Sequence, residues 1–248
     1  SPQFELTLEY TDALPACDDV FLVRTRAREV LYRRGYLLSF MPKPLPDLSG
    51  TGLHVNLSFR DADGNNAMHQ GTREGALSEL VQGCIAGLIQ HHESMGALLA
   101  PTVNSYDRLK PASLCGYWAN WGHDHRGVAV RVSAEEGSAA RIEHRVADCA
   151  ANPYVIVAAV LQAARLGLEN GYELPPAETG DGLETVNTER HVPVSLSDAL
   201  TALEKDAALV DAVGRLLVEN FIAVKRAEIE ETRGKAQAEI FDYYAPFL

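Results

Sequence analysis

The chain has 248 residues, and its 22 Lys and Arg residues against 34 Asp and Glu residues give a formal net charge of −12. Hydrophobic residues make up 46% and charged residues 23%, an ordinary globular composition that argues against disorder. The acidic balance, without a cluster of Lys and Arg, disfavours nucleic acid and anionic membranes as partners. The sequence has no run of about 18 apolar residues, so we expect no membrane span.

The four cysteines are far apart and form no C-x-x-C pair. Each lies in or beside an apolar stretch, so we expect buried free thiols in a reducing compartment. The residues are Cys17, Cys84, Cys115 and Cys149. The spacing argues against a zinc site.

Residues 3–10 alternate apolar and polar side chains, a pattern that predicts a half-buried strand. Asp12 is suited to cap a helix over residues 12–34, in which apolar residues recur at helical spacing. Residues 36–41 predict a second strand. The prolines and glycines of residues 42–52 then predict an irregular loop.

The alternation returns over residues 53–59, which predicts another strand. Residues 73–99 have the pattern of a helix that is interrupted near His92. Further strands are predicted over residues 117–122, 127–132 and 140–146.

The last third of the chain is predicted to be mainly helical. Pro153 suits the first position of a helix over residues 153–170, and residues 171–192 form a surface loop. A helical tail begins near Ser195 and runs in segments to about residue 240. Strands and long helices alternate without a βαβ rhythm, which predicts an α+β fold with a largely antiparallel sheet.

Polar side chains lie two residues apart on three of the predicted strands, and such side chains share a face. The three sets are Gln3, Glu5 and Thr7; His54, Asn56 and Ser58; and Arg141, Glu143 and Arg145. If these faces line one concave surface, the histidine and carboxylates suit Mg²⁺ or Mn²⁺. The arginines suit carboxylate or phosphate, and together these groups are what phosphoryl transfer needs. A structural role for each residue is the alternative, and the common glycine-rich phosphate loops are absent from the sequence.

Histidines occur in two further clusters. His123 and His125 stand beside Arg126 just before a predicted strand, where they are metal ligands or, more often, surface or stacking residues. His91 and His92 fit the end of a helix, where a cation suits the helix dipole.

Several stretches, taken in order, resemble the catalytic domain of glutamine synthetase. They are QFE (residues 3–5), FMPKP (40–44) leading to GTGLH (50–54), PTVNSYDRL (101–109), RIEHR (141–145) and ANPY (151–154), with support from residues 193–200 and 225–226. The resemblance implies one partial catalytic domain over residues 1–248, with a curved, largely antiparallel sheet, flanking helices and a helical C-terminal tail. It also implies that an N-terminal β-grasp domain and the first catalytic strands are missing.

The resemblance assigns roles to individual residues. Glu5 resembles a ligand of a first Mg²⁺ or Mn²⁺ ion, and His54 and Glu143 resemble ligands of a second. For ATP phosphates the matching residues are Arg126 and Arg141, with Ser58 near the nucleotide; for glutamate they are Gly50, Arg108 and Arg145. Arg126 and Arg108 are the predicted catalytic residues.

The resemblance implies ATP-dependent ligation of ammonia to the γ-carboxylate of L-glutamate by a cytoplasmic homo-oligomer built of dodecamer-like rings. The sequence departs from the family pattern at Leu114, where the family usually has a flap glutamate. It also departs at Asn56, where many relatives have a second histidine, and at Ser138, where many relatives have a basic residue. The first departure leaves open a γ-glutamyl-amine ligase that uses methylamine, ethanolamine or a polyamine. A non-catalytic structural homologue is a further alternative. We expect the isolated chain to be inactive, and we expect like-charge repulsion between the carboxylates of its metal sites.

Overall fold

The computed structural model describes residues 3–68, 77–133 and 137–248. Within these residues four short strands form one sheet: β1 (Val55–Leu57), β2 (Trp121–His123), β3 (Val130–Val132) and β4 (Ile142–His144). The order is β1-β4-β3-β2, in which β1 with β4 and β4 with β3 are antiparallel, whereas β2 with β3 is parallel. The prediction of an α+β fold with a largely antiparallel sheet is confirmed, although the strands are shorter than predicted.

The register of the sheet separates an apolar face from a polar face. Val130 and Val132, with Leu57 and Ile142 beside them, are buried on one face. The intervening positions form a row across the opposite face, in which Asn56 and Arg131 both lie opposite the same residue of β4, Glu143. This alternation sets the polar row at the edge of the core.

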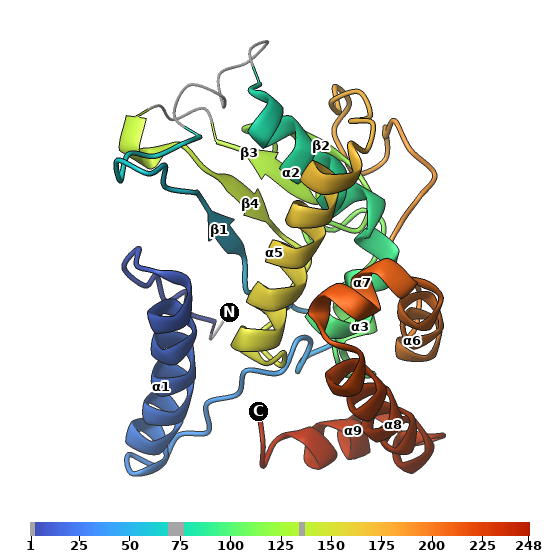
Figure 1. Cartoon of the computed structure of the whole chain (residues 1–248). Helices are drawn as coiled ribbons and strands as arrows, with labels where there is room; N and C mark the ends of the chain where they lie inside the picture. The colour runs from blue at the N-terminus through green and yellow to red at the C-terminus, as the bar shows by residue number, and fades with distance from the viewer. Residues whose placement is uncertain (1–2, 69–76, 134–136) are drawn as a thin grey trace.

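Helices cover the apolar face. They are α2 (Glu79–Gln90), α3 (His92–Leu99) and α5 (Pro153–Asn170), with the short α4 (Ser105–Arg108) and a 3₁₀ turn, Gly137–Ala139, in the connections. Figure 1 shows α2 and α5 crossing in front of the sheet. Glycines allow this close approach, since a Cβ atom on Gly87 would lie 2.0 Å from the Ala163 carbonyl oxygen and one on Gly167 would lie 2.1 Å from that of Gly83.

The ends of α5 follow directly from the sequence. Asn152 accepts hydrogen bonds from the backbone of Tyr154 and Val155, Pro153 opens the helix, and Gly171 ends it in the left-handed conformation with φ 61°. The predicted helix over residues 153–170 is confirmed. The predicted tail is also helical, as α6 (Leu196–Lys205), α7 (Ala207–Val213), α8 (Arg215–Thr232) and α9 (Gln237–Tyr244).

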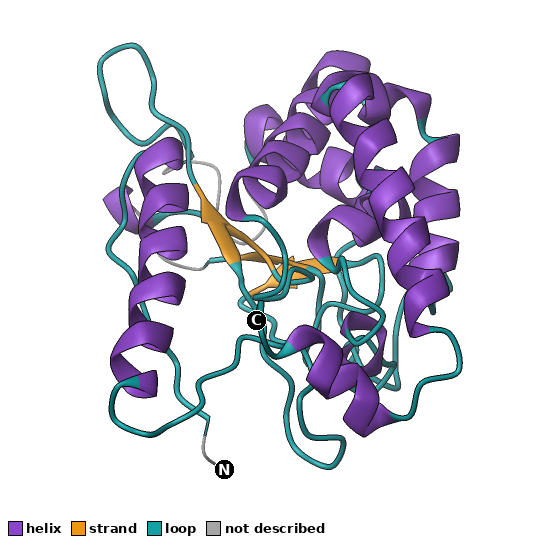
Figure 2. Cartoon of the chain, turned by 90° about the horizontal axis from the view of Figure 1, so that it is seen from below, coloured by secondary structure: helices purple, strands orange, loops and turns teal. Residues whose placement is uncertain are grey.

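The first helix, α1 (Ala13–Tyr32), lies apart from the others. Figure 1 and Figure 2 both show it on the side of the sheet away from α6 to α9. Cys17 is the one buried residue of α1. Polar contacts attach α1 to the segment just before α5; for example, Arg24 Nη1 donates to the Ala151 carbonyl at 2.8 Å.

The C-terminal residues lie against this same helix. Arg28 Nη2 donates to the carbonyls of Ala245 and Pro246, each at 3.0 Å. The Phe40 amide donates to the Leu248 carbonyl at 2.9 Å. Carbonyls of the C-terminal residues therefore hold these residues against α1 and the segment that follows it.

Two predicted strands are wrong. Residues 3–10 are extended but form no strand, and their side chains are exposed on both sides, with Phe4 87% exposed. No described segment pairs with their backbone, and a strand needs such a partner for its N–H and C=O groups. Residues 36–41 likewise contain no strand, because the Tyr36 amide closes the turn at the end of α1 and the Phe40 amide donates to the C-terminal Leu248 carbonyl, so no strand partner among the described residues runs beside them.

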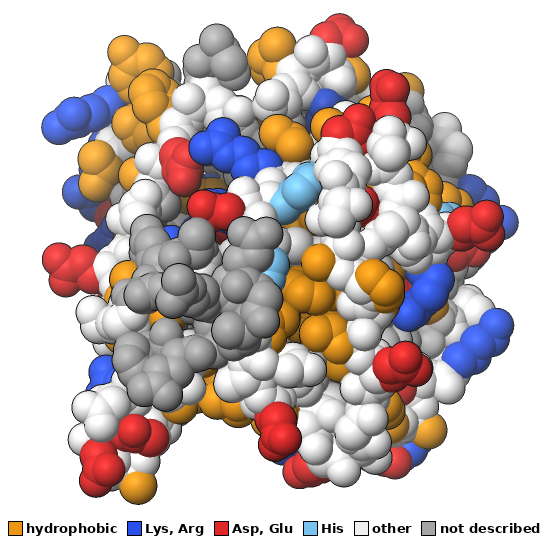
Figure 3. Space-filling model, turned by 90° about the horizontal axis from the view of Figure 1, so that it is seen from above, with side chains coloured by type: hydrophobic (Ala, Val, Ile, Leu, Met, Phe, Trp, Pro, Cys, Tyr) orange, Lys and Arg blue, Asp and Glu red, His pale blue; other side chains and the backbone are white. Residues whose placement is uncertain are grey.

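The surface agrees with the composition. Figure 3 shows acidic and basic side chains scattered over one face of the molecule, around a central group of hydrophobic side chains. The four cysteines are free thiols as predicted, and Cys149 is half-buried whereas the other three are buried. Among the described residues, no helix is long and apolar enough to cross a membrane.

Candidate active site

Glu143 lies at the centre of the polar row on the sheet. Its Oε1 lies 2.8 Å from His54 Nδ1 and 2.9 Å from Arg145 Nη1, and its Oε2 lies 3.4 Å from Arg131 Nη1. The Glu143 side chain is only 13% exposed. The two residues predicted to share a metal ion, His54 and Glu143, are therefore adjacent.

The charges around Glu143 favour its ionised form. Burial alone would raise the pKa of this carboxyl, but the hydrogen bond from His54 and the charges of Arg145, His54 and Arg131 outweigh burial and lower the pKa to about 2. The prediction of like-charge repulsion at this position is wrong, because Glu143 lies against the guanidinium groups of Arg131 and Arg145 and beside His54. Removing this carboxylate would leave guanidinium groups facing one another.

Glu5 is exposed and contacts neither His54 nor Glu143. The segment around it runs beside residues 50–58, since Gln3 Nε2 donates to the Gly50 carbonyl at 2.9 Å and Tyr10 Oη lies 3.3 Å from Ser58 Oγ. Among the described residues, no group of three or more His, Cys, Asp or Glu side chains is arranged to hold a metal ion. His54 and Glu143 thus offer nitrogen and oxygen donors that fit Mg²⁺ or Mn²⁺, but no third ligand is assembled here.

The residues matched to glutamate binding lie together. Arg108 is only 7% exposed, and its guanidinium donates to the carbonyls of Val146 at 2.7 Å and Arg145 at 3.3 Å. A Cβ atom on Gly50 would lie 2.9 Å from Arg108 Cγ, and one on Gly52 would lie 2.7 Å from Arg108 Nη2. Glycine at these positions therefore makes room for the guanidinium.

Arg145 is 6% exposed and connects the two groups. Its Nη1 contacts Glu143, its Nη2 donates to the Leu114 carbonyl at 3.3 Å, and its Nε has no hydrogen-bond partner among the described residues. A buried guanidinium N–H without a partner is costly, which suits a site that an anionic ligand completes.

The residues matched to the nucleotide are more exposed. Arg141 Nε donates to Asn56 Oδ1 at 3.1 Å, which places it on the same face as Glu143. Arg126 is exposed on the turn between β2 and β3. Neither Ser58 nor Arg126 contacts Glu143 directly.

Sequence reasoning missed Arg131. It binds Asp124 Oδ1 through Nη2 at 2.6 Å and Nε at 3.2 Å, in addition to contacting Glu143. The signal was present, because Arg131 interrupts an apolar strand between Val130 and Val132 and so had to face the polar side.

His125 and His91, one from each histidine cluster, have structural partners. His125 Nε2 lies 2.9 Å from the Gly180 carbonyl, and His125 Nδ1 accepts from the Gly127 amide at 3.0 Å, so neither nitrogen is available to a metal. His91 stands between α2 and α3, as predicted for a helix end, with its Nδ1 2.5 Å from Asp206 Oδ2.

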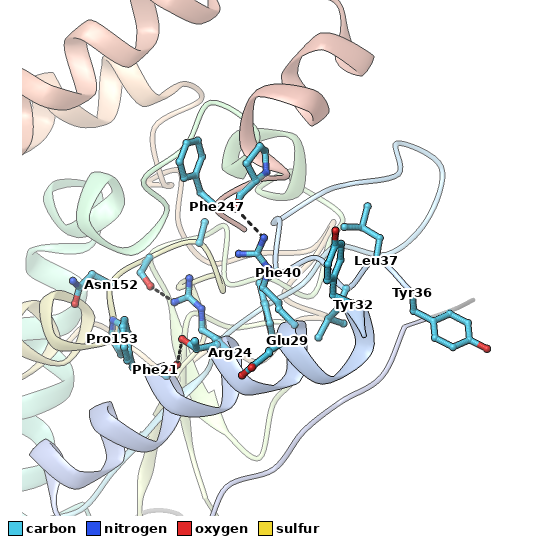
Figure 4. A pocket seen from close by; sticks show the side chains of 16 residues that line it. Phe21, Arg24, Glu29, Tyr32, Tyr36, Leu37, Phe40, Asn152, Pro153 and Phe247 are labelled. Atoms are coloured by element: carbon cyan, nitrogen blue, oxygen red, sulfur yellow. Dashed lines mark hydrogen bonds between the residues drawn. The ribbon is translucent and has the colours of Figure 1, made fainter. Parts of the chain in front are cut away.

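A hollow on the described surface lies elsewhere. It encloses about 560 Å³ between α1, residues 36–40, residues 150–153 and the C-terminal residues. Figure 4 shows aromatic side chains lining it, among them Phe21, Tyr32 and Phe247, with Arg24 directed toward the carbonyl beside Asn152. None of the predicted site residues lines this hollow.

The comparisons with known proteins identify the family of this chain. The family model for the glutamine synthetase catalytic domain matches residues 1–244. The chain belongs to the glutamine synthetase family. It is 33% identical to the glutamine synthetase of Halobacterium salinarum over 98% of this chain and 55% of that protein, and 35% identical to the γ-glutamylputrescine synthetase PuuA of Escherichia coli over 91% of this chain and 46% of that protein.

The fold of this glutamine synthetase family member is also found in solved structures. A GmaS/ADP complex superposes with a TM-score of 0.81 at 33% identity, covering 92% of this chain and 54% of that chain. The chain therefore spans about half the length of the relatives it matches.

Proposed function

We propose that this chain carries the substrate-binding part of an ATP-dependent ligase that joins an amine to the γ-carboxylate of L-glutamate. The observation that supports this most is a series of contacts: His54 and Arg145 both contact Glu143, and Arg108 donates to the Arg145 carbonyl. It connects the residues matched to metal binding with the residues matched to glutamate binding.

In this reaction a γ-carboxylate oxygen of glutamate attacks the terminal phosphorus of ATP, and the bond to the leaving ADP oxygen breaks. The amine nitrogen then attacks the carbonyl carbon of γ-glutamyl phosphate, and the C–O bond breaks to release phosphate. Arg108 and Arg145 would hold the α-carboxylate of glutamate, and Arg126 and Arg141 the phosphate oxygens. A divalent cation held by His54 and Glu143, when bound, would neutralise charge on the nucleotide phosphates.

Ammonia is the first candidate for the nucleophile, and Leu114 favours a second. Leu114 is 53% exposed, and its carbonyl accepts from the buried Arg145, so it lies at the edge of the glutamate-binding group. The leucine side chain offers no carboxylate to attract an ammonium ion or accept its proton. A larger amine such as methylamine, ethanolamine or a polyamine is therefore the alternative, and the relative PuuA is named for putrescine.

The test measures binding first and turnover second. MgATP and L-glutamate are titrated into the 248-residue chain by calorimetry, with Arg145→Lys as the variant expected to weaken glutamate binding and spare MgATP. ADP release is then measured with ammonia, methylamine, ethanolamine and putrescine, for this chain and for a version extended upstream with the N-terminal half of a relative.

We expect turnover only in the extended protein, and the amine with the highest kcat/KM identifies the nucleophile. Glutamate- and amine-dependent ADP release by the 248-residue chain would contradict its expected inactivity. Absence of MgATP and glutamate binding in both forms would favour the non-catalytic homologue. Light scattering on the extended protein tests the ring-shaped homo-oligomer.

A further inference from the structure

Arg126, matched above to the ATP phosphates, is carried by the turn of residues 123–127. Its side chain is exposed and makes no hydrogen bond or ion pair with another described residue. Its place is therefore set by the backbone of the turn. That backbone is unusual, because Asp124 has a positive φ of 48° without being glycine.

The side of the turn that faces the sheet is fixed by Asp124. Its carboxylate accepts from Arg131, which also contacts Glu143. The exposed turn is thus connected to the polar row of the sheet on this side.

His125 fixes the other side of the turn to the loop of residues 178–187. Its Nε2 lies 2.9 Å from the Gly180 carbonyl, and its Nδ1 accepts from the Gly127 amide. These partners require the hydrogen on Nε2 and a neutral ring. One histidine thereby closes the turn that carries Arg126 and attaches it to the loop.

The loop and the turn meet backbone to backbone. A Cβ atom on Gly127 would lie 2.5 Å from the Asp181 carbonyl oxygen, and one on Gly182 would lie 2.8 Å from His125 Cε1. Because Gly127 has no side chain to separate it from the Asp181 carbonyl, a shift in the loop is passed directly to the residue after Arg126.

Glu178 organises this loop. Its side chain is buried, with 6% of the residue exposed, and pairs with no Lys or Arg of the described chain. One carboxylate oxygen accepts from the amides of Thr179 at 3.0 Å and Gly180 at 2.8 Å. The other accepts from the Asn187 amide at 2.9 Å and from Asn120 Nδ2 at 3.1 Å.

The contacts form a continuous path. Gly180 donates its amide to Glu178 and offers its carbonyl to His125, which holds the amide of Gly127. The Glu178 amide itself donates to the Trp121 carbonyl at 2.7 Å, so the loop is also anchored on β2. The carboxylate of Glu178 is the only anion in this path.

We infer that Glu178 and His125 are positioning residues that hold Arg126 where it can bind the phosphates of ATP, so that the 178–187 loop controls nucleotide affinity without touching the nucleotide. The role of Arg126 in this inference rests on the proposed function. The attachment of the turn to the loop does not.

The first measurement tests the attachment alone. Glu178→Gln places an NH₂ group against backbone or amide N–H donors, so the loop should loosen. Glu173→Gln is the matched control, because Glu173 lies in the same connection, is exposed and makes no side-chain hydrogen bond with another described residue. We expect amide hydrogen exchange over residues 123–127 to become roughly tenfold faster in Glu178→Gln and to stay unchanged in Glu173→Gln.

The second measurement tests the link to Arg126. Glu178→Gln and His125→Ala should each weaken MgATP binding about tenfold and leave L-glutamate binding unchanged. Neither change should weaken MgATP binding further in an Arg126→Ala background, because a positioning residue acts only through the residue it positions.

Each outcome decides the inference. Unchanged exchange over residues 123–127 in Glu178→Gln overturns the attachment. Faster exchange with unchanged MgATP affinity, or additive losses with Arg126→Ala, overturns the positioning role. If the unaltered chain binds no MgATP, the proposed function fails for this chain; the nucleotide part of the inference falls with it, and the exchange result decides the attachment by itself.

Discussion

The helices α1 and α5 are nearly the same length, 20 and 18 residues, but they are held in opposite ways. Eight residues of α5 are buried, including Ile156, Ala159 and Ala163, and the helix packs against α2 at a glycine contact. α1 buries Cys17 alone, while Leu14 is 70% exposed and Phe21 56% exposed. Helical spacing of apolar residues thus predicts that a helix forms, but it does not predict how much of that helix the rest of the chain covers.

The largest expected effect is at the contact between α2 and α5. Gly87→Ala places a methyl group against the backbone of Ala163, which cannot move aside, so the free energy of unfolding should fall by about 3 kcal/mol or more. Gly83→Ala on the same helix meets the flexible end of Leu168 and should change stability far less. Urea unfolding followed by circular dichroism compares the two variants. Equal losses would show that the glycine contact does not hold α5.

The second effect extends the comparison to charged groups. Glu143→Gln leaves Arg145, Arg131 and His54 without their shared carboxylate and should lower the free energy of unfolding by about 2 kcal/mol at pH 7. On α1, Glu29→Gln removes exposed pairs with Arg26 and Arg33 and should cost less than about 0.5 kcal/mol.

The pH dependence of the same variant checks the cause. The folded-state pKa of Glu143 is lowered to about 2 from its usual 4.5, so its contribution is complete above pH 4.5 and is lost as the pH falls toward 2. Stability curves of the unaltered chain and Glu143→Gln, measured by urea unfolding, should therefore converge over that interval. Parallel curves would contradict the low pKa.

The third effect is smaller and lies in the helical layer. Asp206 caps α7 by accepting from the Leu209 amide and pairs with the buried His91. Burial would raise the pKa of Asp206, but these hydrogen bonds lower it, so the contribution is present above the usual carboxyl range and lost as the pH falls through the lowered value. Asp206→Asn should reduce stability by about 1 kcal/mol in thermal unfolding. Asp211→Asn, which alters an exposed pair with Arg215, is the control.

The smallest effect is expected on the exposed face of α1. Leu14→Ser removes little buried surface, so the free energy of unfolding should change by less than about 0.5 kcal/mol, as measured by the shift in melting temperature. Ile156→Val on α5 removes one buried methyl group and should cost about 1 kcal/mol. Equal effects would mean that α1 is covered in solution by another surface.

The predictable parts of the fold are those that depend on local sequence. Asn152, Pro153 and Gly171 define α5 because caps and glycine act within a few residues. The strand predicted over residues 3–10 failed because alternation does not reveal whether a partner strand exists. Local patterns predict a strand's faces and leave its pairing open.

The candidate site divides in the same way. The pair of Glu143 and Arg145 follows from their spacing on one strand, whereas the family resemblance was needed to bring His54 to them. Glu178 was missed because three of its four hydrogen-bond donors are backbone amides, which every sequence contains. The importance of such a carboxylate is visible only once the loop has its shape.

The attachment of the C-terminal residues to α1 has a consequence for synthesis of the protein. Arg28 leaves the ribosome long before its partner Ala245, which follows 217 residues later. At roughly 5–20 residues per second, α1 would wait about 10–40 s for that partner. During this time its apolar side chains are available to chaperones, and its final seating follows translation. Variants that lose the Arg28 contacts should therefore lower the yield of folded protein from cells more than they lower the stability of the purified protein.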